Sequence, residues 1–270
     1  MRFQLEFPVI IDRYRSPDAS PAWFTRRFPS LAYYLKILPI VCKASILAKR
    51  GLYDDPAWCR SSFDIFKAIE GVGIQCSIRN LKAVTELSSP FIVVGNHMST
   101  LETFLLPYLI CPHQKFTYIV KESLIRYPVF KHIMISRNPI VVGRRSAKED
   151  FVRVMKEGTK RIEAGYSLAV FPQTTRMTQF DPARFNSIGV KLAKRAGVPI
   201  IPLALKTDAW GTSKWFKDFG KVRPRLDVHM AFGNSLPITS IGREEQKAII
   251  SHIEQNLRKW TTEKTSGPEF

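Results

Sequence analysis

The sequence predicts an α/β protein with a largely parallel sheet flanked by helices. From residue 90 onward, short apolar and β-branched runs alternate with stretches of helical periodicity. We expect strands at 91–94, 117–120, 140–142, 168–171, 200–205 and 226–232, and helices clearest at 146–164, 187–196 and 243–260. Short buried strands that alternate with helices are typical of parallel sheets covered on both faces.

Composition is typical of a globular protein in a reducing compartment. The chain has 270 residues, of which 45% are hydrophobic and 24% charged, so it is long enough for one large domain. Its cysteines are widely spaced and form no C-x-x-C motif: Cys42, Cys59, Cys76 and Cys111. This spacing predicts free thiols, and neither a structural metal site nor a disulfide framework is expected.

The charge is strongly positive and unevenly distributed. Net charge is +18, and the stretch 115–225 contains 23 Lys and Arg against 8 Asp and Glu. Such a field attracts polyanions, which could be nucleic acid, an anionic membrane surface or a phosphorylated substrate. No zinc-finger spacing or aromatic RNA-binding signature is present, so no specific nucleic-acid partner is expected.

Three segments are expected along the chain. Residues 1–60 form an N-terminal amphipathic membrane-interface segment, residues 61–262 form the α/β domain, and residues 263–270 form a frayed tail.

Residues 31–48 carry the membrane signal in the first segment. This 18-residue apolar stretch contains Lys36, Lys43 and a central Pro39, with aromatic and basic residues beside it. A spanning helix needs about 20 mainly apolar residues, and each central lysine opposes insertion by about 2.5–3.5 kcal/mol. Pro39 should also kink the helix. The pattern therefore favours a helix that lies in the membrane interface, with an amphipathic helix packed on the domain as the alternative.

The stretch "GNHMSTLE", residues 95–102, contains the first candidate for chemistry. Ser99 and Glu102 fit a capping box, which by itself would explain Glu102. His97, however, follows directly after an expected strand, where parallel sheets place their ligands. A carboxylate five residues later could hold one ring nitrogen protonated and leave the other free to accept a proton. The two roles of Glu102 are compatible, because a carboxylate has two oxygens.

Two other strand ends carry candidate anion-binding groups. "VFPQTTRM" supplies the hydroxyls of Thr174 and Thr175 and the guanidinium of Arg176, which suit a phosphate, although such a stretch is also a common surface turn. "NPIVVGRR" ends with Arg144 and Arg145, either a solvated strand end or a second anion site.

The strand "VPIIPLAL" contains Pro202, which suggests a bend beside a ligand channel or simply packing. The sequence has no G-x-S-x-G elbow, no phosphate-binding P-loop and no G-x-G-x-x-G motif. An α/β-hydrolase nucleophile and nucleotide folds of those kinds are therefore disfavoured.

Taken in order, these stretches resemble the glycerolipid acyltransferase family, which includes the 1-acyl-glycerol-3-phosphate acyltransferases. The family's first motif, Asn-His followed by four residues and an acid, is matched by Asn96, His97 and Glu102, with Glu where Asp is commoner. Its second motif, Gly-x-Ile-Phe-Ile-Asp-Arg, resembles "NPIVVGR". That stretch keeps the final Arg144, loses the Asp, and replaces the Gly by Asn138, which tolerates a left-handed backbone.

The third and fourth motifs extend the resemblance over about residues 90–205. Phe-Pro-Glu-Gly-Thr-Arg is matched by "FPQTTR", residues 171–176, in which Gln173 and Thr174 replace the Glu and the Gly. A Val-Pro-x-x-Pro-like strand is matched by "VPIIP". The two replacements bear on the identity of the acyl acceptor more than on the chemistry.

The resemblance implies a membrane O-acyltransferase of phospholipid biosynthesis. His97 would be the general base and Glu102 its orienting partner. The acyl donor would be a thioester, acyl-CoA or acyl-carrier protein, with no other cofactor and no metal. The acceptor would be a lysophospholipid, 1-acyl-glycerol 3-phosphate above all, giving phosphatidic acid. The expected phosphate-binding residues are Lys121, Arg144, Thr175 and Arg176, and the expected supporting residues are Asn96, Ser99, Gln173, Thr174 and Pro202.

The same resemblance gives the basic surface a role, because each Lys or Arg close to an anionic membrane contributes about 1 kcal/mol to binding. We expect a peripheral or monotopic protein on the cytoplasmic face. Two alternatives stay open from the sequence: an acyl thioesterase or hydrolase on the same site, and a non-catalytic basic membrane-binding module.

Overall fold

The computed structural model describes residues 4–18, 20–173, 175–213, 219–239 and 241–265. Its strands are β1 (Tyr14–Arg15), β2 (Cys76–Arg79), β3 (Ile92–Gly95), β4 (Lys115–Lys121), β5 (Ile140–Val142), β6 (Tyr166–Val170), β7 (Ile200–Lys206) and β8 (Val228–Phe232). Its α-helices are α1 (Trp23–Arg27), α2 (Pro29–Lys49), α3 (Asp55–Glu70), α4 (Lys82–Thr85), α5 (Leu101–Ile110), α6 (Phe130–Ser136), α7 (Ala147–Glu163), α8 (Ile188–Ala196) and α9 (Arg243–Thr265). Short 3₁₀ turns lie at Glu122–Ile125 and Pro182–Arg184.

In the described part of the chain, the strands form one sheet of mixed but mainly parallel pairing. The order is β1-β2-β8-β7-β3-β6-β4-β5. The five strands from β7 to β5 pair in parallel, whereas β8 is antiparallel to β7 and β1 is antiparallel to β2. The predicted α/β class with a largely parallel sheet is confirmed.

The central strands are buried on both faces, which explains their continuous apolar sequences. Side chains of a strand point alternately to the two faces. In β3, Val93 joins the hydrophobic core on one face, while Ile92 and Val94 join the core on the other. β7 alternates in the same way, with Ile201 on the first face and Ile200 on the second.

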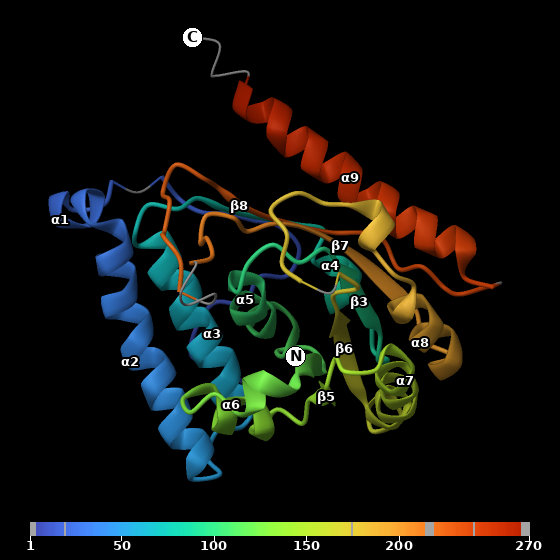
Figure 1. The fold of residues 1–270 in the computed structure, drawn as a ribbon. Coiled ribbons are helices and arrows are strands. Elements are labelled where there is room, and N and C mark those ends of the chain that lie inside the picture. The colour runs from blue at the N-terminus through green and yellow to red at the C-terminus, as the bar shows by residue number, and fades with distance from the viewer. Residues whose placement is uncertain (1–3, 19, 174, 214–218, 240, 266–270) are drawn as a thin grey trace.

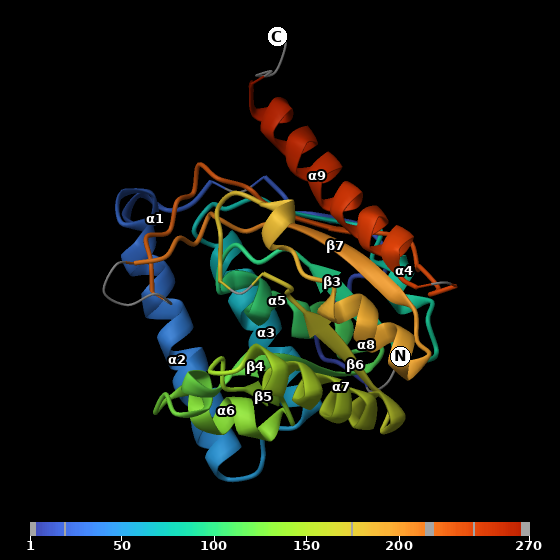
Figure 2. The same cartoon turned by 45° about the vertical axis from the view of Figure 1, so that its right-hand side comes forward.

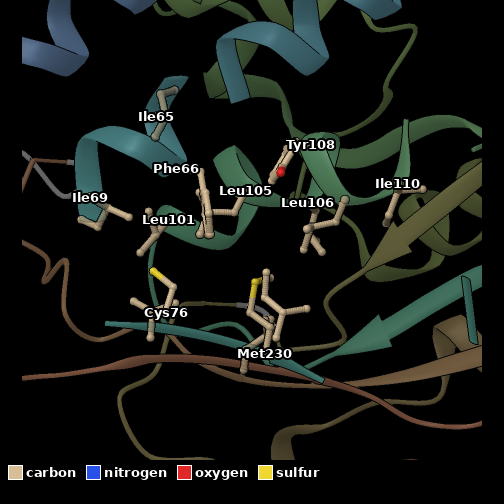
Figure 3. Close-up of a cluster of buried hydrophobic side chains, with 14 of the residues drawn as sticks. Ile65, Phe66, Ile69, Cys76, Leu101, Leu105, Leu106, Tyr108, Ile110 and Met230 are labelled. Carbon is tan, nitrogen blue, oxygen red and sulfur yellow. The ribbon is translucent and has the colours of Figure 1, made fainter. Parts of the chain in front are cut away.

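Helices cover the two faces in two groups. α3 and α5 pack on the first face, where Phe66, Leu105 and Met230 belong to one buried cluster (Figure 3). α7, α8 and α9 cover the second face, as the two views of the ribbon show (Figures 1 and 2). α2 lies outside α3 and also packs on α6, at the opposite side of the molecule from α7.

The N-terminal segment is joined to the sheet domain. β1 pairs with β2, and the expected boundary between residues 60 and 61 falls inside α3, which is one continuous helix. Asp54 caps α3 by accepting a hydrogen bond from Ala57 N at 2.9 Å, and Pro56 occupies its first turn. The sequence does not predict β1, because a two-residue strand forms only through pairing with its partner.

α2 contains the stretch in which the sequence predicts an interfacial helix. The helix continues through Pro39. Its inner face buries Tyr33, Ile37, Val41 and Ala44 at helical spacing. Its outer stripe exposes further apolar side chains, namely Leu31, Leu35, Leu38 and Ile46. Within the described residues, α2 is the one helix that is long and apolar enough to cross a membrane.

The C-terminal helix is longer than the sequence predicts. α9 extends to Thr265, so residues 263–265 are helical instead of part of a frayed tail, and residues 266–270 lie outside the described part. Ile249, Ile253 and Trp260 anchor α9 on the sheet and are almost completely buried.

Candidate active site

The site begins where β3 ends at the centre of the sheet. β3 lies between β7 and β6, so its carboxyl end is covered from both sides. Gly95 allows this close approach, because a Cβ there would lie 2.7 Å from the carbonyl oxygen of Leu203. The side chain of Asn96 then donates to Leu205 O and accepts from Leu205 N, both at 2.8 Å. These bonds fix the start of the His97 loop to β7, and they are consistent with the supporting role expected of Asn96.

His97 and Glu102 are in direct contact. The Nδ1 atom of His97 lies 2.8 Å from Oε1 of Glu102. Phe171 stacks on one face of the imidazole, with ring centroids 4.7 Å apart and an interplanar angle of 12°. The carboxylate and the aromatic ring therefore restrict the imidazole plane, and Nε2 is the nitrogen left to meet a ligand.

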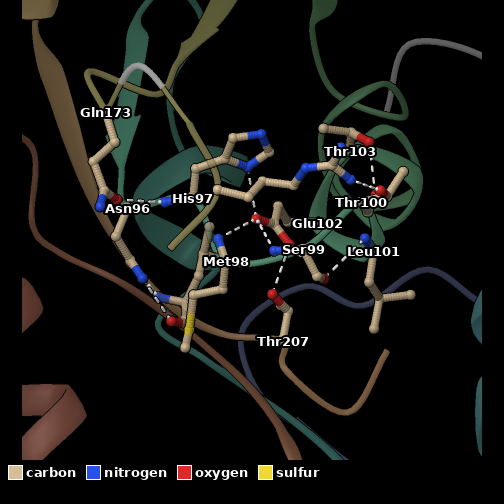
Figure 4. A network of polar contacts seen from close by, with 12 residues as sticks. Asn96, His97, Met98, Ser99, Thr100, Leu101, Glu102, Thr103, Gln173 and Thr207 are labelled. Atoms are coloured by element: carbon tan, nitrogen blue, oxygen red, sulfur yellow. Dashed lines mark hydrogen bonds and ion pairs between the residues drawn. The ribbon is translucent and has the colours of Figure 1, made fainter. Parts of the chain in front are cut away.

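Glu102 is completely buried and serves as a hydrogen-bond acceptor for several groups (Figure 4). Besides His97, it accepts from Met98 N at 2.8 Å, from Ser99 N and Oγ at 3.0 Å, and from Thr207 Oγ1 at 2.6 Å. Burial alone would raise the pKa of Glu102, but the hydrogen bonds from His97 and Thr207 and the charge of His97 hold that pKa below its usual value. The group is therefore a carboxylate at neutral pH.

The capping role and the partner role of Glu102 coexist. Glu102 accepts from Ser99 N, which is the return contact of a capping box, whereas Ser99 Oγ accepts from Leu101 N at 3.1 Å, two residues on instead of three. The residue that precedes α5 is Thr100 rather than Ser99, and it makes no side-chain cap bond. One carboxylate thus closes the helix and holds the histidine.

The loop after β6 folds over His97. Gln173 Oε1 accepts a hydrogen bond from His97 N at 2.8 Å, and Met177 N donates to His97 O at 2.9 Å. Arg176 donates from Nη1 to the hydroxyl of Thr100 at the start of α5. These contacts bring the first and third sequence motifs together. Thr174 lies outside the described residues.

A cavity of about 720 Å³ joins the histidine to the expected phosphate-binding residues. His97, Lys121, Arg144, Thr175 and Arg176 all line it. Arg145 is exposed and is not among the lining residues. The cavity wall therefore carries three cationic side chains and the imidazole, while the Glu102 carboxylate is completely buried.

The backbone at β5 explains how Arg144 enters this wall. Asn138, just before β5, has φ +51°, which confirms that the position needs a left-handed backbone. Arg144, just after β5, has φ +58°, an uncommon value for a residue with a long side chain. Lys121 ends β4 opposite Val142, so the two cations follow neighbouring strands.

Pro202 does not line the cavity. β7 runs without interruption through it, and its ring packs against Gly233, where an added Cβ would lie 2.9 Å from the proline Cβ. The bend beside a channel is therefore not present, and packing is the reason for this proline. Pro202 is tolerated because pairing with β8 begins one residue later, at Leu203.

Several groups at the site were not predicted from the sequence. Thr207 donates a hydrogen bond to the Glu102 carboxylate, and Thr100 accepts one from the Arg176 guanidinium. Phe171, which the sequence marks only as part of a motif, stacks on His97. A threonine at a strand end gives little signal of its own. The rest of the cavity is largely apolar and includes side chains of α2, α3 and α6.

No metal centre is indicated in the described part of the chain, because no group of three or more His, Cys, Asp or Glu side chains could hold an ion there.

Known proteins resemble this chain in sequence over most of its length. The family model described as Acyltransferase matches residues 74–206. A 1-acyl-sn-glycerol-3-phosphate acyltransferase of Pseudomonas aeruginosa is 27% identical over 207 residues, which are 76% of this chain and 74% of that protein. One of Borreliella burgdorferi is 26% identical over 172 residues, 63% of this chain and 66% of that protein.

A solved structure shares the fold. The crystal structure of the 1-acyl-sn-glycerophosphate (LPA) acyltransferase PlsC from Thermotoga maritima aligns with a TM-score of 0.62 and 16% identity, covering 86% of this chain and 94% of that one. The matched residues 74–206 contain the His97–Glu102 pair and all the expected phosphate-binding side chains. Over residues 74–206 the chain is therefore similar to the acyltransferase family, and together these comparisons support an acyltransferase enzyme.

Proposed function

We propose that the enzyme transfers a fatty acyl group from a thioester donor to the free hydroxyl of 1-acyl-glycerol 3-phosphate, giving phosphatidic acid. The observation that carries this proposal is the shared cavity, in which the imidazole of His97 faces the same space as Lys121, Arg144 and Arg176. A base beside several cations suits an acceptor with a hydroxyl and a phosphate. Curated relatives named for this acceptor support the assignment.

In the proposed mechanism, Nδ1–H of His97 donates to Glu102 and Nε2 accepts the proton of the acceptor hydroxyl as its oxygen attacks the thioester carbonyl. Glu102 stabilises the imidazolium that forms, since its carboxylate lies 2.8 Å away in a buried environment. The tetrahedral intermediate collapses by breaking the carbon–sulfur bond, and the departing thiolate takes the proton from His97. No covalent acyl-enzyme is needed.

Phosphate binding falls to the cations and one hydroxyl of the cavity wall: Lys121, Arg144, Thr175 and Arg176. Arginine suits this role because its planar guanidinium can donate two parallel hydrogen bonds to phosphate oxygens. Gln173 carries no charge, so the loop beside Arg176 presents an amide where the family motif has a carboxylate.

The apolar part of the same cavity suits a fatty acyl chain. Ile40, Val41 and Ala44 of α2 and Phe130 and Ile133 of α6 line it. A chain bound there would run from the reacting carbonyl toward α2. This direction supports a substrate that arrives from a membrane.

Membrane association is proposed through the outer stripe of α2 and the basic charge of the protein. Leu31, Leu35, Leu38 and Ile46 are each 46–60% exposed, in a helix whose other face is already packed on the domain. An apolar stripe with lysines beside it suits a helix lying at the cytoplasmic face of an anionic membrane. The protein would then be peripheral or monotopic.

The experiment that tests the function uses pure protein in anionic vesicles with palmitoyl-CoA and a panel of acceptors. The panel contains 1-acyl-glycerol 3-phosphate, its choline and ethanolamine counterparts and glycerol 3-phosphate, and the lipid products are identified by mass spectrometry. We expect phosphatidic acid from the first acceptor, and CoA release that depends on it. CoA release at the same rate without any acceptor would refute acyl transfer in favour of thioester hydrolysis.

The donor is tested in the same system by replacing palmitoyl-CoA with palmitoyl-acyl-carrier protein at equal concentration. Product from either donor is consistent with the proposed chemistry, and the ratio of the two kcat/KM values assigns the donor.

A further inference from the structure

One carboxylate beside the cavity is not part of the His97–Glu102 pair. Asp150 lies in the first turn of α7, and its side chain reaches back to the loop that precedes the helix. Oδ1 accepts a hydrogen bond from Gly143 N at 2.9 Å, and Oδ2 accepts one from Arg144 N at 2.7 Å. The carboxylate thus binds two successive backbone amides.

This contact accompanies an unfavourable backbone conformation. Arg144 has φ +58°. The other described non-glycine residues with positive φ are Asn80 and Asn138, and asparagine tolerates this region more readily than arginine does. Successive N–H groups that converge through a left-handed residue form a concave anion-binding turn. In this protein the anion in the turn is the protein's own Asp150.

The conformation has a consequence for the cavity. Arg144 lines it together with Lys121 and Arg176. The direction in which a side chain leaves the backbone depends on φ and ψ, so a change at Arg144 to an ordinary negative φ would turn its guanidinium away from its present place. The turn lies near the surface, where Arg144 and Arg145 are both exposed.

We infer that Asp150 is a positioning residue for the acceptor phosphate: it holds the Gly143–Arg144 turn in the left-handed form that places the Arg144 guanidinium in the cavity wall. This inference rests on the proposed function, because it assigns Arg144 to the phosphate of the acceptor. In the family motif that this segment resembles, the acid is adjacent to the arginine. Here Gly143 occupies that position, and the carboxylate comes from the next helix.

The main competing role for Asp150 is a purely electrostatic one at the N-terminus of α7. Acids in a first helical turn are stabilising wherever their side chains point. Glu149 provides the matched control, because it belongs to the same turn and has the same charge. Its exposed side chain makes no hydrogen bond or ion pair with the residues that the structure describes.

The two roles predict opposite signs for substrate binding. Removing an acid beside a cationic cavity should strengthen the attraction of an anionic phosphate, and so lower the KM for 1-acyl-glycerol 3-phosphate. Loss of positioning should raise that KM. We expect Asp150→Ala to raise it about tenfold, since misplacing a substrate-holding group by an ångström can cost up to about 100-fold. The kcat and the KM for palmitoyl-CoA should stay within about twofold of wild type, because the His97–Glu102 pair is untouched.

The test measures acceptor KM, donor KM and kcat for wild type, Asp150→Ala, Glu149→Ala, Arg144→Ala and the Asp150→Ala/Arg144→Ala double variant. Glu149→Ala should leave the acceptor KM unchanged or lower. The double variant should have the same acceptor KM as Arg144→Ala alone, because Asp150 acts through Arg144. Thermal unfolding of each variant checks the fold. If the alanine variant does not fold, Asp150→Asn replaces it, with a smaller rise expected because one acceptor oxygen is kept.

Two results would overturn the inference: an acceptor KM for the Asp150 variant equal to or below that of wild type, or a double variant whose KM rise is the product of the two single rises. Both presuppose that the wild type transfers acyl groups to this acceptor. A wild type without acceptor-dependent transfer would refute the proposed function itself, so the two failures are distinguishable.

Discussion

At the scale of single residues, the proposed mechanism requires that Glu102 remain charged inside the protein. A buried carboxylate is costly unless it is paired and hydrogen-bonded. Glu102 meets this requirement through His97, two backbone amides and two hydroxyls. These same bonds fix its oxygens relative to the imidazole. The site is therefore preorganised by the interactions that make the buried charge tolerable.

Thr207 offers a test of this arrangement through stability. Thr207→Val removes the hydroxyl that donates to Glu102 while keeping the shape of the side chain. We expect the free energy of unfolding to fall by about 1.5–3 kcal/mol, because a hydrogen bond to a buried charge is lost. Thr207→Ser, which keeps the hydroxyl, is the control. Urea denaturation followed by circular dichroism measures both, and equal stability of the valine variant and wild type would contradict the role given to Thr207.

The ionisation of Glu102 predicts a pH dependence. Its pKa is lowered in the folded state, so the stability it contributes is complete above the unfolded-state value of about 4.3 and is lost as the pH falls through the folded-state value. The difference in unfolding free energy between wild type and Glu102→Gln should therefore be largest near pH 7 and should shrink below about pH 4. Denaturant titrations across this range measure it. A difference that grows as the medium becomes more acidic would show that the carboxylate is not the stabilised form.

At the scale of the elements, the exposed apolar stripe of α2 is the surface through which we propose that the enzyme binds a membrane. Cys42 lies on the outer stripe of this helix, four residues after Leu38 and four before Ile46. The remaining cysteines, Cys59, Cys76 and Cys111, are buried, and burial raises the pKa of the Cys59 thiol to about 12. Cys42 is therefore a natural single-site reporter for the exposed face of α2.

Maleimide labelling of the native protein should modify Cys42 alone, and the denatured protein should be modified at all four cysteines. Anionic vesicles should protect Cys42, because the stripe that contains it becomes buried in the lipid interface. Zwitterionic vesicles should protect Cys42 less, because they lack the negative surface charge that attracts the basic protein. Labelling that is as fast with anionic vesicles as in buffer would remove α2 from the membrane-binding surface.

The elements also show where sequence patterns are informative. The sequence predicts the strands after residue 90 and the helices α7 and α8 within a few residues, because buried parallel strands are continuously apolar and these helices have strong periodicity. It predicts no range for α5 or α6, and α9 ends beyond its expected limit. β1 and β2 were missed, since they are short and their apolar positions gain meaning only from pairing with each other and with β8. The left-handed backbone at Asn138 was predicted because one residue type signals it.

At the scale of the whole molecule, the cavity brings together side chains from strands that are neighbours in the sheet and distant in the chain. The order β7-β3-β6-β4-β5 places the ends of these strands along one edge, so His97, Lys121, Arg144 and Arg176 meet there. The motifs therefore contain His97 and the cationic side chains of the cavity wall. The contact of Thr207 with Glu102 joins residues 105 positions apart, and no local pattern announces it.

The apolar half of the cavity could not be predicted either, because its residues come together only through contacts between distant parts of the chain. Ile40, Val41 and Ala44 of α2 line it, but their sequence is that of any apolar helix. Only the packing of α2 on α3 and α6 brings them within reach of the site. α2 thus lines the cavity with one face and carries the exposed stripe proposed for membrane binding on the other.

Catalysis by His97 as the general base is tested by the turnover of His97→Ala with palmitoyl-CoA and 1-acyl-glycerol 3-phosphate. We predict that kcat falls by about 10²–10⁴-fold, because the general base is lost. Sedimentation with anionic vesicles should stay as in wild type, since the imidazole does not belong to α2. The melting temperature should fall, because the buried Glu102 carboxylate loses its contact with His97, so circular dichroism at the assay temperature checks that the variant is folded. Turnover equal to that of wild type in this folded, vesicle-bound variant would contradict the account.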